Sequence, residues 1–556
     1  MQNVPSLFQP ATQNMKFIFI HFSYYIMLAL FLLWVFISAK VLKAHLQPFS
    51  TQVRKHWKGA LFCLLVSGFL FAVVPPDYRV LSDETNLVGV SKSMTFKKTV
   101  TNTTEGYWYY RTFYPENDGI EKRPLMFPFF ASLAHTFTGY RHTNVFGVNF
   151  VFLVFIFLLT YLYFKKIAGS WAAYAAVLLL SSQPLISLCA ASGGMDTMAL
   201  LFFMIVFMSL GWYLAKPDAD KLLFLWIQLL MFINVRYELI AIVAWIALAL
   251  IVSGSIPWRY IRPYRPLYLL SPLLVLPYFL QRLLTWGDFE LANNTVKPFA
   301  FDHMIRHTGN FLVTLIDVEM FLPYATAVNL TGVVGLLCFL WMFLGKKIVA
   351  EKMTRRATWI LLSAMTLYWM IISSHHMGIS DHPTQARFFM VFVTILTGFA
   401  AWLLSRQSWI KKYPAVFIGL ALACMTLYLP VASENRFANT LLLIREYHFI
   451  EDFIKKQPDK NFLLVTNRPG MFTVENYGAI TISRANKDRE KIFSNLERKL
   501  FREVYVFQHI DYVTKAPSKG FELAKPFTLQ PVAELQNTTK EKLRISRVVL
   551  PSQRAL

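Results

Sequence analysis

The chain of 556 residues is 55% hydrophobic and 16% aromatic but only 16% charged, which excludes an ordinary soluble globular protein. Its formal net charge of +23 would suggest nucleic-acid binding in a soluble chain. Here, however, Lys and Arg gather in short clusters between apolar stretches, such as Lys165–Lys166 and Arg355–Arg356. This is the pattern of cytoplasmic loops in membrane proteins. We therefore expect a polytopic membrane protein and exclude nucleic acid as a partner.

Apolar stretches long enough to cross a hydrocarbon core of about 30 Å follow one another along the chain. The expected spans are 16–38, 58–76, 144–164, 169–191, 197–215, 221–235, 238–253, 268–284, 324–344, 357–374, 388–404 and 413–431. Arg236 and Glu238 interrupt one long apolar stretch, which we divide into two short spans. Because the basic clusters fall in every second loop, both chain ends are expected on the outer side of the membrane.

Three parts are expected: an extra N-terminal span with a basic cytoplasmic loop (1–57), a transmembrane core (58–431) and a soluble domain on the outer side (432–556). The core has long outer loops at 77–143 and 285–323. In the first loop, WYYRTFY and PLMFPFFASLAHTFTGY have the aromatic spacing of helices lying in the membrane interface.

The C-terminal part alternates helix-like and strand-like segments. REYHFIEDFIKKQ and REKIFSNLERKLF predict amphipathic helices, and NFLLVTN, GAITISR, EVYVFQHI and ISRVVL predict strands. The expected fold class is therefore an α-helical polytopic membrane protein of about twelve helices with a C-terminal soluble α/β domain.

An adjacent carboxylate pair, Asp83 and Glu84, stands directly outside the second span. Ionisable groups so near hydrocarbon are costly and are candidates for function. A carboxylate at this place can take a proton from an acceptor nucleophile. We interpret Asp83 as this base, with Glu84 beside it to raise its pKa or to position a group. The alternative is that the pair only begins a solvated loop.

Three cations on the same side are candidates for binding a leaving phosphate. Lys122 and Arg123 lie near the end of the first long outer loop, and Arg387 begins a late span. Guanidinium groups are well suited to phosphate. For Lys122 and Arg123 the alternative is contact with phospholipid headgroups, or snorkelling of their long side chains.

Asp196, Arg236 and Glu238 also lie at outer helix ends and are candidates for lining a cavity. Asp196 follows two glycines and begins a helix, so N-capping alone would explain it. Arg236 and Glu238 can instead pair with each other.

Histidines cluster between two late spans. His375 and His376 precede Asp381–His382, with His303 or His307 as further candidates for a shared metal. The spacing matches no closed zinc pattern. No cofactor is assigned, and a divalent metal remains an alternative.

These motifs resemble the GT-C class of polytopic glycosyltransferases, in particular the branch of lipid A aminoarabinose transferases and protein O-mannosyltransferases. In that branch the first outer loop opens with Asp-Glu-Thr-Arg-Tyr and contains Glu-Lys-Pro-Pro-Leu. This chain has Asp83-Glu84-Thr85-Asn86-Leu87 and Glu121-Lys122-Arg123-Pro124-Leu125. Asp196 at a helix start and the pair Arg387-Phe388 are similar to later family features. The resemblance covers residues 58–405 and is stronger in the first half.

The resemblance implies an inverting transfer of a sugar from a polyprenyl-phosphate donor to a lipid, glycan or protein acceptor. Asp83 would act as the base or position the acceptor, and Lys122 and Arg387 would bind the donor phosphate with Arg123 as a helper. Glu121 resembles a metal-site glutamate, which adds it to the metal candidates His375 and His376.

The resemblance also implies an integral membrane protein of the bacterial inner membrane with its active site facing the periplasm, or of the endoplasmic reticulum as the alternative. Two other classes of function remain open. A polytopic transporter or lipid flippase of envelope glycoconjugates is one, although transporters place ionisable groups nearer mid-membrane. A scaffold subunit is the other.

Overall fold

The computed structural model describes residues 9–45, 49–109, 112–116, 119–291, 297–345, 352–407, 412–434, 442–536 and 538–550. The chain divides into two compact units. The first unit comprises Met1–Arg79, Lys122–Phe130 and Val145–Arg436, and the second comprises Val80–Glu121, Ala131–Asn144 and Phe437–Leu556. Two parts of the long outer loop at 77–143 therefore belong to the same unit as the C-terminal residues.

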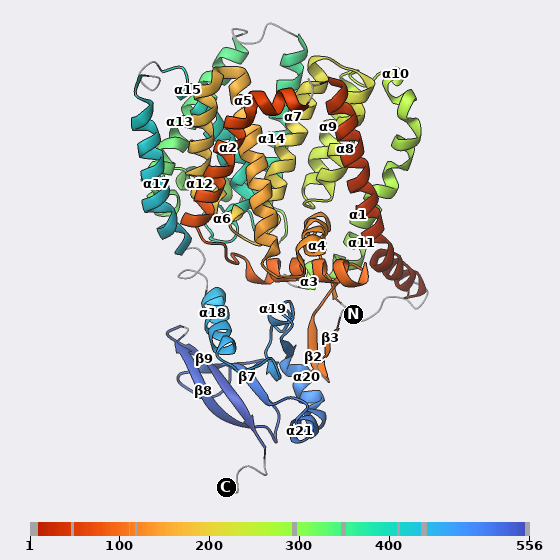
Figure 1. Cartoon of the computed structure of the whole chain (residues 1–556), viewed down its shortest axis with the longest axis vertical. Helices are drawn as coiled ribbons and strands as arrows, with labels where there is room; N and C mark the ends of the chain where they lie inside the picture. Colours follow the sequence, from red (N-terminus) through yellow and green to blue (C-terminus); the bar gives the residue numbers. More distant parts are fainter. Residues whose placement is uncertain are drawn as a thin grey trace. The chain divides into compact units, whose positions relative to one another are not determined.

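The first unit is a bundle of helices (Figure 1). Its elements are α1 (Gln9–His45), α2 (Phe49–Val73), α5 (Asn144–Ser181), α6 (Pro184–Ala190), α7 (Asp196–Ala215), α8 (Ala219–Ile233), α9 (Leu239–Val252), α10 (Trp258–Ile261), η1 (Arg262–Tyr264), α11 (Arg265–Leu291), α12 (Phe301–Thr314), α13 (Val318–Leu344), α14 (Lys352–Ser374), η2 (Ala386–Phe389), α15 (Met390–Leu404) and α17 (Pro414–Glu434). The short α4 (Met126–Thr138) begins in this unit and ends in the second.

Within the described residues, nine helices are long and apolar enough to span a membrane, against the twelve expected spans. The expected spans 144–164 and 169–191 differ most. The first, with part of the second, forms α5, whose helical backbone is interrupted at Gly169 (φ 88°), where the second span was expected to begin, and the rest of the second forms the separate α6. The expected spans 221–235 and 238–253 form α8 and α9, which have 15 and 14 residues. At a rise of about 1.5 Å per residue both are shorter than the hydrocarbon core.

Close backbone contact holds two helices of the bundle together. A Cβ atom at Gly332 or Gly335 of α13 would collide with carbonyl oxygens of α15, those of Leu396 and Phe399. Small residues at such positions let membrane helices approach closely. The helix α15, which follows Arg387, is thereby fixed along α13.

The second unit is built from α3 (Leu81–Lys97), β1 (Thr101–Asn102), β2 (Glu105–Tyr109), β3 (Thr112–Glu116), β4 (Gly119–Ile120), α18 (Leu442–Lys455), β5 (Phe462–Val465), α19 (Gly470–Thr473), β6 (Gly478–Ile480), α20 (Ile482–Lys487), α21 (Arg489–Glu497), β7 (Glu503–Asp511), β8 (Thr528–Gln536) and β9 (Glu541–Val549). Its main sheet has seven strands in the order β3-β2-β6-β5-β7-β9-β8. The strand β5 runs parallel to β6 and β7, and the other pairs are antiparallel.

The hairpin β2–β3 of the outer loop extends the C-terminal sheet through β6 (Figure 1, orange beside blue). Alternating side chains of the central strands explain the layers. Leu463, Val465, Val504 and Val506 pack in one core cluster, and Phe462 and Tyr505 contact each other on the other face. This period-2 pattern with both faces apolar is that of a buried strand.

Most sequence-based elements of this unit are confirmed and one is wrong. The helices α4, α18 and α21 and the strands β5, β7 and β9 form where the patterns predict them. WYYRTFY, expected as an interfacial helix, forms the described parts of the β2–β3 hairpin instead, because the pairing of β2 with β3 and with β6 outweighs a weak local pattern. GAITISR is a strand only to Ile480, after which Thr481 caps α20. The expected loop 285–323 contains α12, and residues 292–296 lie outside the described part.

Candidate functional site

Four of the predicted residues form one buried charge cluster in the first unit. Asp196 is the first residue of α7, Arg236 and Glu238 lie between α8 and α9, and Arg387 lies in η2. An Nη1 atom of Arg236 contacts Oδ1 of Asp196, and its Nε lies 2.6 Å from Oε1 of Glu238. Nη1 of Arg387 lies 3.6 Å from Oδ2 of Asp196. The prediction that Arg236 pairs with Glu238 is confirmed, but Asp196 makes no side-chain cap and pairs with two arginines instead.

The cluster is nearly closed to solvent. The side chains of Asp196 and Arg236 are each 4% exposed, and that of Arg387 is 12% exposed. The two guanidinium groups also lie against one ring, at 4.7 Å and 5.5 Å from the centroid of Phe388. Buried charges persist in proteins when they are paired in this way. Two cations and two carboxylates balance, so the cluster itself carries no net charge.

Lys122, Arg123 and Arg282 form a second group of basic residues in the first unit. The backbone of Lys122 and Arg123 is fixed by α11, because Arg282 donates to the carbonyl oxygen of Lys122 and Gln281 Nε2 donates to that of Arg123 at 2.7 Å. Arg282 in turn lies 4.6 Å from the ring centroid of Tyr237, next to Arg236 in the chain. Arg282 therefore adds a positive charge beside Tyr237, and α11 holds the backbone that carries Lys122 and Arg123.

Arg79 lies between α2 and α3 and is a further buried basic residue of the first unit. It is 2% exposed, its Nη1 donates to Sγ of Cys189 at 2.9 Å, and its Nη2 donates to the carbonyl oxygen of Pro383 at 2.7 Å. Cys189 also accepts from Thr197, the residue after Asp196, through its carbonyl oxygen at 2.9 Å. Sequence reasoning assigned no role to Arg79 or Arg282. A basic residue beside an outer helix end was the only signal for either.

Asp83 and Glu84 lie in the second unit, in the first turn of α3. The helix dipole stabilises negative charge at this end of a helix. Their environments differ. Glu84 is 1% exposed, and its Oε1 accepts from the backbone N–H of Val80 at 3.0 Å, which satisfies a donor at the helix start. Asp83 is half-buried. Of the two carboxylates, Asp83 is therefore the one more accessible to a reacting group.

The metal candidates are not brought together as a set. Within the part of the chain that the structure describes, no group of three or more His, Cys, Asp or Glu side chains has the arrangement of a metal site. His375 and His376 have ring centroids 4.4 Å apart, and burial lowers the pKa of His375 to about 4, so its ring is neutral at pH 7. Glu121 lies in the second unit and the histidines in the first. A site of these three residues stays a prediction.

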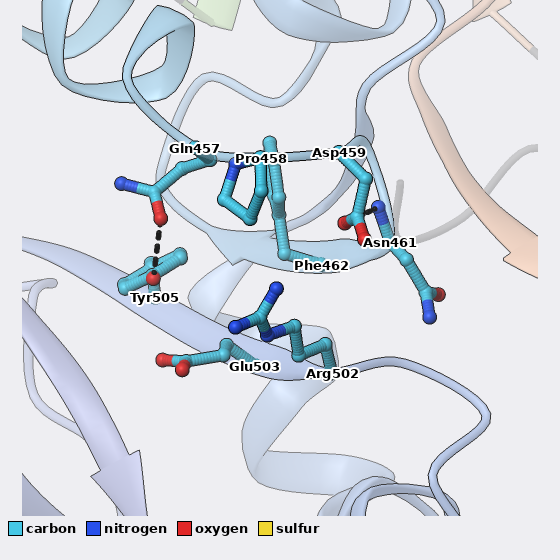
Figure 2. Close-up of a pocket in the computed structure, with 8 residues that line it drawn as sticks. All are labelled: Gln457, Pro458, Asp459, Asn461, Phe462, Arg502, Glu503 and Tyr505. Carbon is cyan, nitrogen blue, oxygen red and sulfur yellow. Dashed lines mark hydrogen bonds between the residues drawn. The ribbon is translucent and has the colours of Figure 1, made fainter.

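A small pocket in the second unit lies at the amino-terminal ends of β5 and β7 (Figure 2). Figure 2 shows Arg502 and Glu503 at its edge and Tyr505 Oη donating to Oε1 of Gln457 at 3.0 Å. No predicted site residue lines it. Ligands of parallel sheets bind at the carboxyl ends of the strands. We therefore assign this pocket no part in the reaction.

The described residues define a class of protein, an integral membrane protein with nine helices long and apolar enough to span a membrane and a C-terminal strand-containing domain. The family described as "Dolichyl-phosphate-mannose-protein mannosyltransferase" matches residues 122–281, the stretch from Lys122 to Gln281 that includes Asp196, Arg236 and Glu238. No curated protein matches the chain.

Among solved structures, the chain is similar to ArnT from Cupriavidus metallidurans. The apo state aligns over 89% of this chain and 98% of that chain, with a TM-score of 0.53 and 12% identity. The form bound to undecaprenyl phosphate aligns over 88% and 98%, with a TM-score of 0.49 and 13% identity. The oligosaccharyltransferase of Archaeoglobus fulgidus, tethered with an acceptor peptide, aligns over 82% and 69%, with a TM-score of 0.41 and 12% identity. The match to the apo structure shows that the two folds are similar, and the resemblance expected from the sequence is confirmed.

Proposed function

We propose that this protein is a glycosyltransferase that moves a sugar from a polyprenyl-phosphate donor to a lipid, glycan or protein acceptor. The observation that carries the proposal is the charge arrangement of the first unit. Arg387 is held beside Asp196 in a buried cluster with Arg236 and Glu238, and Asp196, Arg236 and Lys122 lie within the stretch that matches a mannosyltransferase family. Such a site favours a species that gains negative charge.

The donor phosphate gains this charge when the sugar leaves it. In the proposed reaction an acceptor hydroxyl attacks the anomeric carbon of the sugar from the side opposite the phosphate, which inverts its configuration. The bond between the anomeric carbon and the phosphate oxygen breaks, and its electron pair stays with the phosphate. Lys122 and Arg387 stabilise that oxygen anion, and Arg123 assists.

Asp83 takes the proton of the attacking hydroxyl in this proposal. It is the half-buried member of the carboxylate pair, whereas Glu84 already binds the backbone at the start of α3 and so holds the helix that carries Asp83. A carboxylate base of this kind contributes a factor of about 10² to 10⁴ to the rate. Asp196, Arg236 and Glu238 keep Arg387 in place.

The acceptor class, the compartment and any metal are parts of the proposal that need separate tests. Charged groups at helix ends on one side suit an enzyme facing the periplasm of a bacterial inner membrane. A metal bound by Glu121, His375 and His376 would supply positive charge for the leaving phosphate. Transfer that persists after treatment with a chelator would remove the metal from the proposal.

The decisive experiment measures transfer of labelled sugar from a panel of polyprenyl-phosphate sugars into lipid, glycan and protein fractions. Purified wild type is compared with Asp83→Asn, and Asp452→Asn on α18 is the control because Asp452 is an exposed aspartate of the same unit. We expect label in one fraction, a loss of at least about 100-fold in Asp83→Asn, and no change in the control. Full activity in Asp83→Asn would refute the assignment of the base.

The alternative class, a transporter or lipid flippase, makes a different prediction in the same membranes. It expects movement of intact lipid-linked sugar across the bilayer with no new glycosidic bond. Uptake of label without transfer to any acceptor would favour it. Neither movement nor transfer, with the protein folded, would favour a scaffold role.

A further inference from the structure

One turn of the second unit has all its backbone carbonyls bound by side chains. We call residues 473–476, between α19 and β6, the carbonyl turn. The donors are Lys92 Nζ to Thr473 O (2.7 Å), Tyr140 Oη to Val474 O, Lys460 Nζ to Glu475 O (2.9 Å) and Trp108 Nε1 to Asn476 O (2.8 Å). Asn476 has a φ of 62°, in the left-handed region that ends a helical turn and leaves carbonyls without helical partners.

Three of the four donors come from distant parts of the sequence. Lys92, Tyr140 and Trp108 lie 334 to 381 positions before the carbonyls that they bind. They are on α3, after α4 and on β2, so both parts of the outer loop in this unit contact one turn of the C-terminal part. A side chain that binds a backbone carbonyl fixes both partners. Thr473 O also accepts from the backbone N–H of Asn476 at 3.1 Å, so Lys92 is the second donor to that carbonyl and ties it to α3.

Lys92 is the unusual member of this set. It is 6% exposed, and its Nζ lies 4.7 Å and 5.3 Å from the ring centroids of Phe113 and Tyr140. Among the described residues no carboxylate pairs with it, and burial, with Lys460 and Lys97 as neighbouring cations, lowers its pKa to about 7. A buried lysine is costly, and an apolar chain of the same length would be cheaper. The amine is therefore there for the contact that it makes.

The same helix carries the proposed base. Asp83 lies in the first turn of α3 and Lys92 nine residues later, on one uninterrupted helix of 17 residues. Ser91, the residue before Lys92 on α3, adds a second attachment, since its Oγ lies 3.0 Å from Nε2 of His135. A helix is stiff over this length, so fixing it at Lys92 fixes the rotation and axial position of Asp83.

We propose that Lys92 is a positioning residue for the transfer reaction: its contact with the carbonyl turn sets the orientation of α3 and thereby that of Asp83. The inference rests on the proposed function for the role of Asp83. The attachment of α3 to the carbonyl turn is independent of any reaction and is tested separately.

The test compares Lys92→Met with Lys97→Met in the full-length protein, because Lys97 is an exposed lysine of the same helix. Hydrogen exchange of the backbone amides is measured for α3 and the carbonyl turn. For Lys92→Met we expect at least tenfold faster exchange in both segments, and for Lys97→Met no change. Unchanged exchange in Lys92→Met would overturn the attachment, whether or not the protein transfers sugar.

Kinetics then test the positioning role. A displacement of about 1 Å at a reacting group can cost about 100-fold in rate. We expect kcat of Lys92→Met to fall 10- to 100-fold with the KM for the donor within twofold. Lys92→Arg, which keeps a long cationic donor, is expected to recover part of kcat. A kcat within twofold of wild type, or equal losses in Lys92→Arg and Lys92→Met, would overturn the positioning role.

Two further outcomes are assigned in advance. If wild type transfers no sugar from any donor, the proposed function fails, and exchange still decides the attachment. If Lys92→Met does not fold, Tyr140→Phe replaces it, because this change removes one donor to the same turn and buries no new group. Faster exchange in α3 of Tyr140→Phe would support the attachment, and unchanged exchange would overturn it.

Discussion

The charge cluster of the first unit offers a stability prediction with a worked magnitude. Asp196→Asn removes the carboxylate that contacts both Arg236 and Arg387 and leaves Glu238 alone to balance the two guanidinium groups. For the longer of the two contacts, 3.6 Å, an effective dielectric constant of about 20 gives about 5 kcal/mol of attraction. Removing one partner of a buried pair costs about 3–5 kcal/mol in practice. We expect a loss of that size in the free energy of unfolding.

A double-mutant cycle tests the physical reason. If the loss arises from an uncompensated positive charge, Arg387→Gln in the Asp196→Asn background should restore about 1–2 kcal/mol, although Arg387→Gln alone destabilises. The free energy of unfolding is measured by titration with a denaturing detergent in mixed micelles. The control is Asp302→Asn, since Asp302 lies exposed on α12.

The cycle can contradict the reasoning in two ways. Effects of the two substitutions that add to within about 0.5 kcal/mol would show that the side chains do not interact. A loss below about 1 kcal/mol in Asp196→Asn would place the cluster in a solvated environment, because exposed ion pairs contribute no more than that. Equal losses of unfolding free energy in Asp196→Asn and in the control Asp302→Asn would likewise show that the cluster is solvated.

Three more predictions concern stability. The pKa of Lys92 falls to about 7 from its ordinary 10.5, so between these pH values the unfolded chain binds more protons than the folded one. The free energy of unfolding should therefore rise with pH in this window, by at most about 1.4 kcal/mol per pH unit. A thermal-melting profile of Lys92→Met should lack this rise. Gly332→Ala should destabilise by about 1–3 kcal/mol, because its Cβ meets the backbone of α15, whereas Gly211→Ala, with open space around it, should be neutral in the same melting assay. The isolated fragment 437–556 lacks β2 and three donors to the carbonyl turn, and it should show no cooperative melting by circular dichroism; cooperative melting at the temperature of the full chain would contradict this.

The parts of the structure that local pattern determines were predictable from the sequence. Apolar runs mark the membrane helices, and short runs rich in apolar and β-branched residues mark β5, β7 and β9. The positions of Asp196 and Arg387 at helix starts were also predictable, because a charge that ends an apolar run must lie where a helix leaves the apolar layer. The pairing of Asp196 with Arg236 and with Arg387 was not, since a salt bridge between distant residues leaves no mark in local pattern.

Long-range pairing accounts for what the sequence missed. The hairpin β2–β3 joins β6 through a partner 373 positions away, Gly106 with Ala479, and a short aromatic segment alone does not distinguish a strand from an interfacial helix. Arg79 and Arg282 gain their meaning only from the carbonyl oxygens that they bind. The carbonyl turn is likewise invisible in the sequence, because its backbone acceptors are the same at every residue.

The residues proposed for the base and for the donor phosphate belong to different units. The candidate base, Asp83, belongs to the unit that contains the C-terminal domain, whereas Lys122 and Arg387 belong to the helix bundle. A change that loosens α3 should therefore act on the chemical step and leave donor affinity intact. A change in the charge cluster around Asp196 should act first on donor affinity, because Arg387 would lose its support. Separate effects of these two kinds of substitution on kcat and KM would therefore distinguish the base from the phosphate site.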